Sequence, residues 1–132
     1  MTNSIARNNI VYNEPSGIFV SQSHNNQIYN NTISKCGDGI NINSGSSNNK
    51  ILANTIFHST TNAIFVASGA SSNTFSSNKI VASSPQGLKI EQDPTSKNNI
   101  FSNNQPYWYH IATCFFLQMV RKRIQAAFAS GS

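Results

Sequence analysis

A motif of asparagine and isoleucine returns along this chain about every two dozen residues. It reads Asn-x-Ile-x-x-Asn-x-Ile, with phenylalanine replacing the first isoleucine once. Its copies begin 23 to 25 residues apart, at Asn3, Asn26, Asn49, Asn73 and, incompletely, Asn98. Self-similarity at a fixed period of 20 to 50 residues is typical of solenoids and other repeat arrays. The repeat therefore constrains the architecture more than any local propensity does.

A second signature follows each of the first four copies by about 14 residues. It reads Gly-Ile-Phe-Val at 17–20, Gly-Ile-Asn-Ile at 39–42, Ala-Ile-Phe-Val at 63–66 and Gly-Leu-Lys-Ile at 87–90. Apolar residues alternate with other residues in both signatures, which is the pattern of a strand with one buried face. Runs of Asn, Gly and Ser between the signatures supply turn residues that tolerate positive φ.

Strands that recur once per repeat stack in parallel, so the sequence predicts an all-β parallel β-helix of about five coils over residues 1–105. We expect one interior ladder to consist of Ile5, Ile28, Ile51, Phe75 and Ile100. The two asparagine columns should form stacked amide ladders that satisfy enclosed polar groups. These columns are Asn3, Asn26, Asn49, Asn73 and Asn98, and Asn8, Asn31, Asn54, Asn78 and Asn103.

These motifs resemble the right-handed, single-stranded parallel β-helix repeats of the pectate-lyase-like superfamily, over about residues 3–104. They look most like the branch with the NosD-type periplasmic proteins and the mannuronan C5-epimerase relatives. The resemblance implies an extracellular or periplasmic parent protein. Because the first coil begins at Asn3 with no signal peptide before it, we expect the chain to be a fragment.

The charge distribution argues against a nucleic-acid partner. The net charge is +5, but residues 1–105 carry six basic and all four acidic side chains, a balance of +2. Those six basic side chains are scattered, whereas nucleic-acid binding favours a basic cluster with aromatics between. The two cysteines, Cys36 and Cys114, match no metal or redox spacing.

Residues 106–132 do not follow the repeat. Apolar residues fall at helical spacing from Ile111, which predicts a helix within 111–128 whose Phe115, Met119 and Ile124 cover apolar surface. Three interpretations stay open: a cap on the β-helix, a helix that self-associates or lies on a membrane surface, and a tail foreign to the parent protein. Self-association through the open ends of the β-helix is a further alternative.

Candidate catalytic residues are few. Asp38 lies between glycines, and Lys89, Glu91 and Asp93 lie close together near the end of the repeat region. Alginate epimerases carry an Asp-Pro-His motif, which Asp93-Pro94-Thr95 resembles in its first two residues only. Thr95 removes the imidazole expected to do acid–base work. If the chain is an enzyme, the resemblance implies a carbohydrate lyase or epimerase, but we expect this chain to be non-catalytic as it stands.

The outward side of the second signature is the best candidate for binding. Aromatic, amide and basic side chains would there suit sugar rings, hydroxyls and a uronate carboxylate. The sequence thus predicts a polysaccharide partner, anionic or neutral, and neither metal nor cofactor. The alternative is a NosD-like structural or copper-site maturation β-helix without sugar chemistry, although the histidines do not cluster. The predicted binding residues are Phe19, Asn41, Asn43, Phe65 and Lys89.

Overall fold

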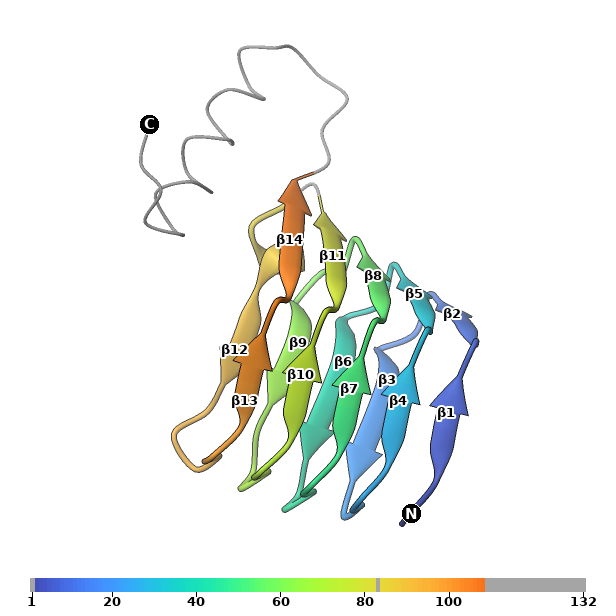
Figure 1. The fold of residues 1–132 in the computed structure, drawn as a ribbon. Helices are drawn as coiled ribbons and strands as arrows, with labels where there is room; N and C mark the ends of the chain where they lie inside the picture. Colours follow the sequence, from blue (N-terminus) through green and yellow to red (C-terminus); the bar gives the residue numbers. More distant parts are fainter. Residues whose placement is uncertain (1, 83, 109–132) are drawn as a thin grey trace, which may run out of the picture.

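The protein is a parallel β-helix with three sheets (Figure 1). The computed structural model describes residues 2–82 and 84–108, which form fourteen short strands and one 3-10 helix. Each coil contributes one strand to each sheet, and every pairing is parallel. The described residues make four coils of three strands and two strands of a fifth. This confirms the predicted all-β solenoid.

The first sheet contains β1 (Ile5–Arg7), β4 (Gln27–Tyr29), β7 (Lys50–Leu52), β10 (Thr74–Ser76) and β13 (Ile100–Ser102), in that order. The second sheet contains β2 (Ile10–Tyr12), β5 (Thr32–Ser34), β8 (Thr55–Phe57), β11 (Lys79–Ala82) and β14 (Gln105–Trp108). The third contains β3 (Ser16–Ser21), β6 (Asp38–Asn43), β9 (Asn62–Val66) and β12 (Ile90–Gln92), with the 3-10 helix η1 (Gln86–Leu88) before β12.

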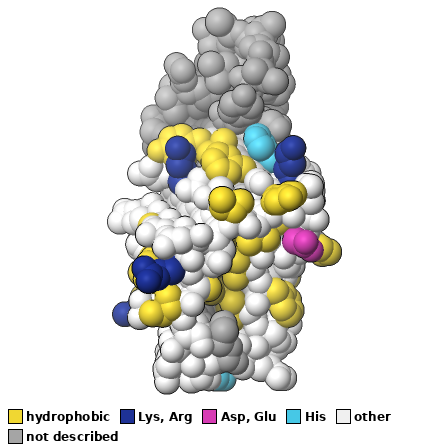
Figure 2. All heavy atoms as spheres, turned by 90° about the vertical axis from the view of Figure 1, so that its right-hand side faces the viewer, with side chains coloured by type: hydrophobic (Ala, Val, Ile, Leu, Met, Phe, Trp, Pro, Cys, Tyr) yellow, Lys and Arg dark blue, Asp and Glu magenta, His cyan; other side chains and the backbone are white. Residues whose placement is uncertain are grey.

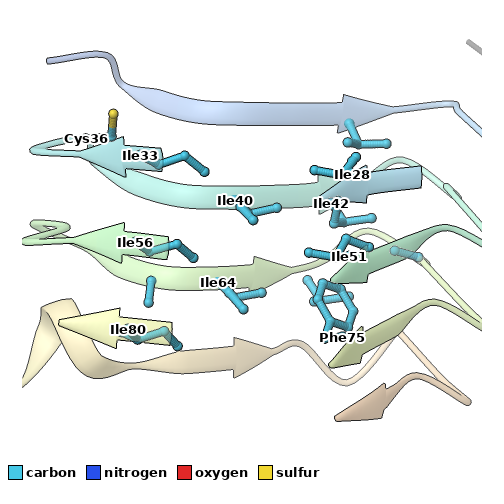
Figure 3. Packing of buried hydrophobic residues seen from close by; sticks show 14 residues of the cluster. Ile28, Ile33, Cys36, Ile40, Ile42, Ile51, Ile56, Ile64, Phe75 and Ile80 are labelled. Atoms are coloured by element: carbon cyan, nitrogen blue, oxygen red, sulfur yellow. The ribbon is translucent and has the colours of Figure 1, made fainter. Parts of the chain in front are cut away.

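The core is a set of apolar ladders along the axis of the coils (Figure 3). Ile28, Ile51 and Phe75 lie over one another in the first sheet, and each is at most 1% exposed. Ile33, Ile56 and Ile80 repeat this arrangement in the second sheet and are fully buried. Each coil thus packs its inward residues on those of its neighbours.

The predicted interior ladder was wrong at both ends. Ile5 and Ile100 are 58% and 59% exposed, and the residues in register with Ile28 and Phe75 are Ala6 and Phe101. Shifting a strand by one residue moves every side chain to the opposite face. The asparagine ladders shift with it. They are Asn26, Asn49, Asn73 and Asn99, with Ser4 in the first coil, and Asn9, Asn31, Asn54, Asn78 and Asn104.

The asparagine doublets explain this shift. The residue before each ladder position has positive φ, as in Asn8 (58°), Asn30 (54°) and Asn98 (59°). The next residue directs its side chain inward and joins the amide ladder. The backbone bend and the ladder position therefore fall on successive residues. Asn visits the left-handed conformation more readily than most other residues do. At Asn3, Asn8, Asn98 and Asn103, the motif had selected the turning residue instead of the ladder residue.

The β-helix continues past residue 105, where the sequence analysis ended it. β14 pairs with β11, and Pro106 occupies the position of Ile80. The helix predicted within 111–128 lies outside the described residues. Within residues 2–82 and 84–108, no helix has the length and apolarity needed to cross a membrane.

Candidate functional site

The outward face of the third sheet carries a row of aromatic and polar side chains. Phe19, Asn41 and Phe65 lie at the same level of β3, β6 and β9, as predicted. Phe19 is 57% exposed, whereas Asn41 is only 8% exposed. Asn41 lies in register between Phe19 and Phe65 on the two adjacent strands. Cross-strand neighbours of this kind lie about 5 Å apart.

Lys89 does not extend this row. Glu91 is the residue in register with Phe65, and Lys89 lies before β12, exposed and ion-paired with Glu91 through Nζ and Oε2. The sequence from Ile80 to Ile90 is longer than the corresponding segment in earlier coils. The chain takes up the extra residues in η1, which contains Gly87 and Leu88. The alignment that placed Lys89 in the row was therefore shifted by two residues.

On the same face, a chain of hydrogen bonds runs along β6 from Ser44 to Asp38. Ser44 Oγ donates to Asn43 Oδ1 (2.9 Å), Asn43 Nδ2 donates to Asn41 Oδ1 (3.2 Å), and Asn41 Nδ2 donates to Asp38 Oδ2 (3.0 Å). From the next coil, Asn62 Nδ2 donates to the other carboxylate oxygen of Asp38 at 3.0 Å. Asp38 is partly buried. Each carboxylate oxygen keeps capacity for a further donor.

Asp93 serves the turn that follows β12. Its Oδ1 accepts hydrogen bonds from the backbone N–H and hydroxyl groups of both Thr95 and Ser96, at 2.8–3.1 Å. Its Oδ2 accepts the backbone N–H of Ser68 in the preceding coil at 2.9 Å. The backbone N–H of Ser68, followed by the Thr95 hydroxyl, lowers the pKa of Asp93 from 3.8 to about 2. This carboxylate links two coils and is built to stay ionised.

A lowered pKa makes the contribution of Asp93 dependent on pH. The ionised carboxylate stabilises the fold above the unfolded-state pKa, and this stabilisation is lost as the pH falls from about 4 toward about 2. We expect wild type to melt at a higher temperature than Asp93→Asn at pH 7, and this difference to shrink below pH 4. Thermal melts of both proteins from pH 7 to pH 2 measure it. The exposed Glu14→Gln variant is the control, and an undiminished difference at pH 2 would contradict the assignment.

The described histidines and acidic residues do not assemble a metal centre. Within residues 2–82 and 84–108, no group of three His, Cys, Asp or Glu side chains could hold an ion. His24 Nδ1 lies 2.8 Å from Ser47 Oγ, and the His58 ring lies beside Phe57. Cys36 is buried as a free thiol. His110 and Cys114 lie outside the described residues.

The comparison with protein families decides the broad assignment. The model described as "Right handed beta helix region" matches residues 1–116. The chain belongs to the right-handed β-helix family. No curated protein and no solved structure matches the chain at a significant level. The predicted right-handed parallel β-helix is thus confirmed at the level of the family.

In this right-handed β-helix, the main residue that sequence reasoning missed is Asn62. It lies level with Asp38 on the adjacent strand, and it is 5% exposed. Its Oδ1 has no hydrogen-bond partner among the described residues, so the contact with Asp38 orients the amide. A sequence signal existed: the residue before each second signature is polar in the first three coils, as Ser16, Asp38 and Asn62.

Proposed function

We propose that this right-handed β-helix binds a neutral polysaccharide on the outward face of β3, β6 and β9. The observation that carries the proposal is the row Phe19–Asn41–Phe65 beside the amide-held carboxylate of Asp38. Aromatic rings supply an apolar surface for the flat faces of sugar rings. The free acceptor capacity of Asp38 suits sugar hydroxyl donors, because hydrogen bonds to an ionised acceptor are stronger than neutral ones.

The charges on this face favour a neutral polymer over a uronate. Asp38 and Glu91 are both carboxylates on the third sheet. Lys89, the basic side chain predicted for this face, lies in the fourth coil and is ion-paired with Glu91. A polymer carrying a carboxylate on each sugar would meet like charge here, which disfavours binding. The basic residues Arg7, Lys50 and Lys79 belong to strands of the other two sheets.

The same contacts support binding without catalysis. Glycoside hydrolysis requires two carboxylates that flank one bond. Asp93 accepts five hydrogen bonds within its turn, Glu91 is paired with Lys89, and Asp38 is held by two amides. Each of the four predicted catalytic candidates therefore has a structural partner. Asp38 is the one that we assign to the ligand.

Replacing Phe65 by Ala should weaken binding of a neutral polysaccharide about tenfold, because loss of one stacking ring costs on the order of 1–1.5 kcal/mol. The measurement is retardation of the protein in native gels containing neutral glucan, xylan, mannan or galactan, with alginate and pectate alongside. Phe57→Ala is the matched control, since Phe57 is also half-buried but belongs to β8 of the second sheet. Both variants should keep the wild-type circular dichroism spectrum.

Three outcomes would overturn this proposal. If alginate or pectate retards the protein and the neutral polymers do not, the preference for neutral polymers is contradicted. Equal weakening by Phe57→Ala and Phe65→Ala would move the binding surface away from the third sheet. If no polymer retards the wild-type protein, the chain does not bind these polysaccharides.

A further inference from the structure

The acidic and basic side chains of this β-helix are separated by sheet. All four acidic residues of the chain lie in the third sheet or in the connections next to it: Asp38 in β6, Glu91 in β12, Glu14 before β3 and Asp93 after β12. No strand of the first or second sheet therefore carries a carboxylate. Figure 2 shows the separation from one end of the β-helix: acidic side chains are visible at the right-hand border, whereas Lys and Arg side chains lie at the left-hand border and near the top.

The first and second sheets carry exposed lysines instead. Lys50 belongs to β7, Lys79 belongs to β11, and Lys35 directly follows β5. Within residues 2–82 and 84–108, these three lysines form no ion pair, unlike Lys89, which is paired with Glu91. The strands β5, β7 and β11 each pair with a neighbour on both sides. The surface that they present is a side of the β-helix, so it does not depend on how either end is covered.

Apolar side chains lie among these lysines. Lys50 and Leu52 are two residues apart in β7, and Lys79 and Val81 are two residues apart in β11, so each pair shares the outward side of its strand. The residues between them, Ile51 and Ile80, point into the core. The apolar residues of this surface are half-buried and form two cross-strand pairs, Tyr29 with Leu52 and Phe57 with Val81.

This combination suits an anionic lipid surface. Basic side chains near such a surface gain electrostatic attraction, and the apolar groups beside them gain from entering the boundary between headgroups and acyl chains. Lysine can keep its ammonium group at the headgroups while its stem lies along apolar surface. A nucleic acid would use the cations and the aromatic rings, but it offers no comparable environment to the aliphatic side chains of Leu52 and Val81.

We propose that the outward sides of β4, β5, β7, β8, β10 and β11, which we call the basic face, dock on an anionic lipid surface. Lys35, Lys50 and Lys79 contact the lipid phosphates, and the two apolar cross-strand pairs lie against the interface. The third sheet forms another side of the β-helix (Figure 1), so the row Phe19–Asn41–Phe65 stays accessible. Docking is therefore independent of polysaccharide binding, and either proposal can fail without the other.

Co-sedimentation with lipid vesicles tests the proposal on the full chain. Vesicles made of equal parts of phosphatidylglycerol and phosphatidylcholine should retain the protein, and vesicles of phosphatidylcholine alone should not. Sodium chloride at about 1 M should weaken the binding strongly, because the Debye length then falls to about 3 Å. The retained fraction at increasing lipid concentration gives the apparent affinity.

Lys50→Gln should weaken binding to the mixed vesicles about fivefold, which corresponds to the attraction of one basic side chain near an anionic surface. Lys89→Gln is the matched control. It removes the same charge from the chain, but Lys89 lies beside the third sheet and is paired with Glu91. The control should therefore change vesicle binding less than about twofold.

The two phenylalanines of the polysaccharide test exchange roles here. Phe57→Ala should weaken vesicle binding several-fold, since Phe57 belongs to β8 of the basic face. Phe65→Ala should leave vesicle binding unchanged, since Phe65 belongs to β9 of the third sheet. Circular dichroism of both variants establishes that a loss of binding does not come from unfolding.

The basic residues outside the described part of the chain need a separate variant. Arg121, Lys122 and Arg123 are consecutive in the sequence. Replacing all three by Gln should leave binding to the mixed vesicles that Lys50→Gln still weakens about fivefold. If the triple variant no longer binds and Lys50→Gln has no effect in the wild-type background, binding belongs to residues 121–123 and the proposal is wrong.

Four further results would overturn the proposal: no retention of wild type by the mixed vesicles, equal retention by phosphatidylcholine alone, equal effects of Lys50→Gln and Lys89→Gln, or equal effects of Phe57→Ala and Phe65→Ala. A single-stranded oligonucleotide that binds the protein when the vesicles do not would assign the basic face to nucleic acid instead.

Discussion

Replacing Asn54 by Ala should lower the free energy of unfolding by about 3–5 kcal/mol, one of the largest effects that we expect. Asn54 Oδ1 accepts both the N–H and the Nδ2 of Asn31, and Asn54 Nδ2 donates to Asn78 Oδ1 and to the Ile28 carbonyl. The truncation leaves buried donors of Asn31 without an acceptor, at a cost of about 1–3 kcal/mol each. Urea unfolding monitored by circular dichroism measures the loss.

The control for this prediction is the other asparagine of the doublet. Asn30 is exposed and has a φ of 54°. The equivalent turning positions hold Ala53 and Ser77, so Asn30→Ser should change the free energy of unfolding by less than about 1 kcal/mol. Similar losses for Asn54→Ala and Asn30→Ser would show that the ladder bonds do not carry the difference between the two positions.

Phe75→Ala should cost a comparable amount, about 3–5 kcal/mol. Phe75 is fully buried, lies in the ladder above Ile51 and stacks on Phe101. The truncation removes apolar contacts and leaves a cavity between two coils, which stacked strands cannot close without breaking their pairing. Because small proteins are stable by only about 5–15 kcal/mol, the melting temperature should fall markedly.

Phe75→Leu separates the cavity from the loss of the ring. Leucine restores most of the volume, and isoleucine is found at the equivalent positions 28 and 51, so this variant should cost less than about 1.5 kcal/mol. Denaturant titrations give the free energy of unfolding of both variants, and the comparison requires that the slope of each titration equals that of the wild type. If Phe75→Leu were as destabilised as Phe75→Ala, the stacking of Phe75 on Phe101 would matter more than the packed volume.

The period of the sequence predicted the fold class, and the middle coils were assigned in the correct register. Ile28, Ile51 and Phe75 stack as predicted. At the ends, Asn98-Asn99-Ile100-Phe101 fits the motif in two registers one residue apart, and the sequence alone offers no reason to choose. The choice follows from hydrogen bonds between coils, since Asn99 Oδ1 accepts from Asn73.

Only part of the candidate site could be predicted from the sequence, because the lengths of the connections decide which residues of neighbouring strands align. Phe19, Asn41 and Phe65 belong to coils with short connections, so their alignment could be deduced from the second signature. The fourth coil inserts η1, and Gly87-Leu88-Lys89-Ile90 imitates the signature without forming its strand. The pairing of Asp38 with Asn62 joins residues 24 apart. It depends on the exact length of one coil, which periodicity gives only approximately.

The most direct test of the binding face is a map of amide chemical shifts. Uniformly ¹⁵N-labelled protein would be titrated with a neutral oligosaccharide cut from the polymer that retards it most. We predict that the largest shifts appear at Asp38, Asn41, Asn62 and Phe65, the residues of the aromatic row and its hydrogen-bond chain. Shifts confined to strands of the first and second sheets, with β3, β6 and β9 unchanged, would contradict the proposed site.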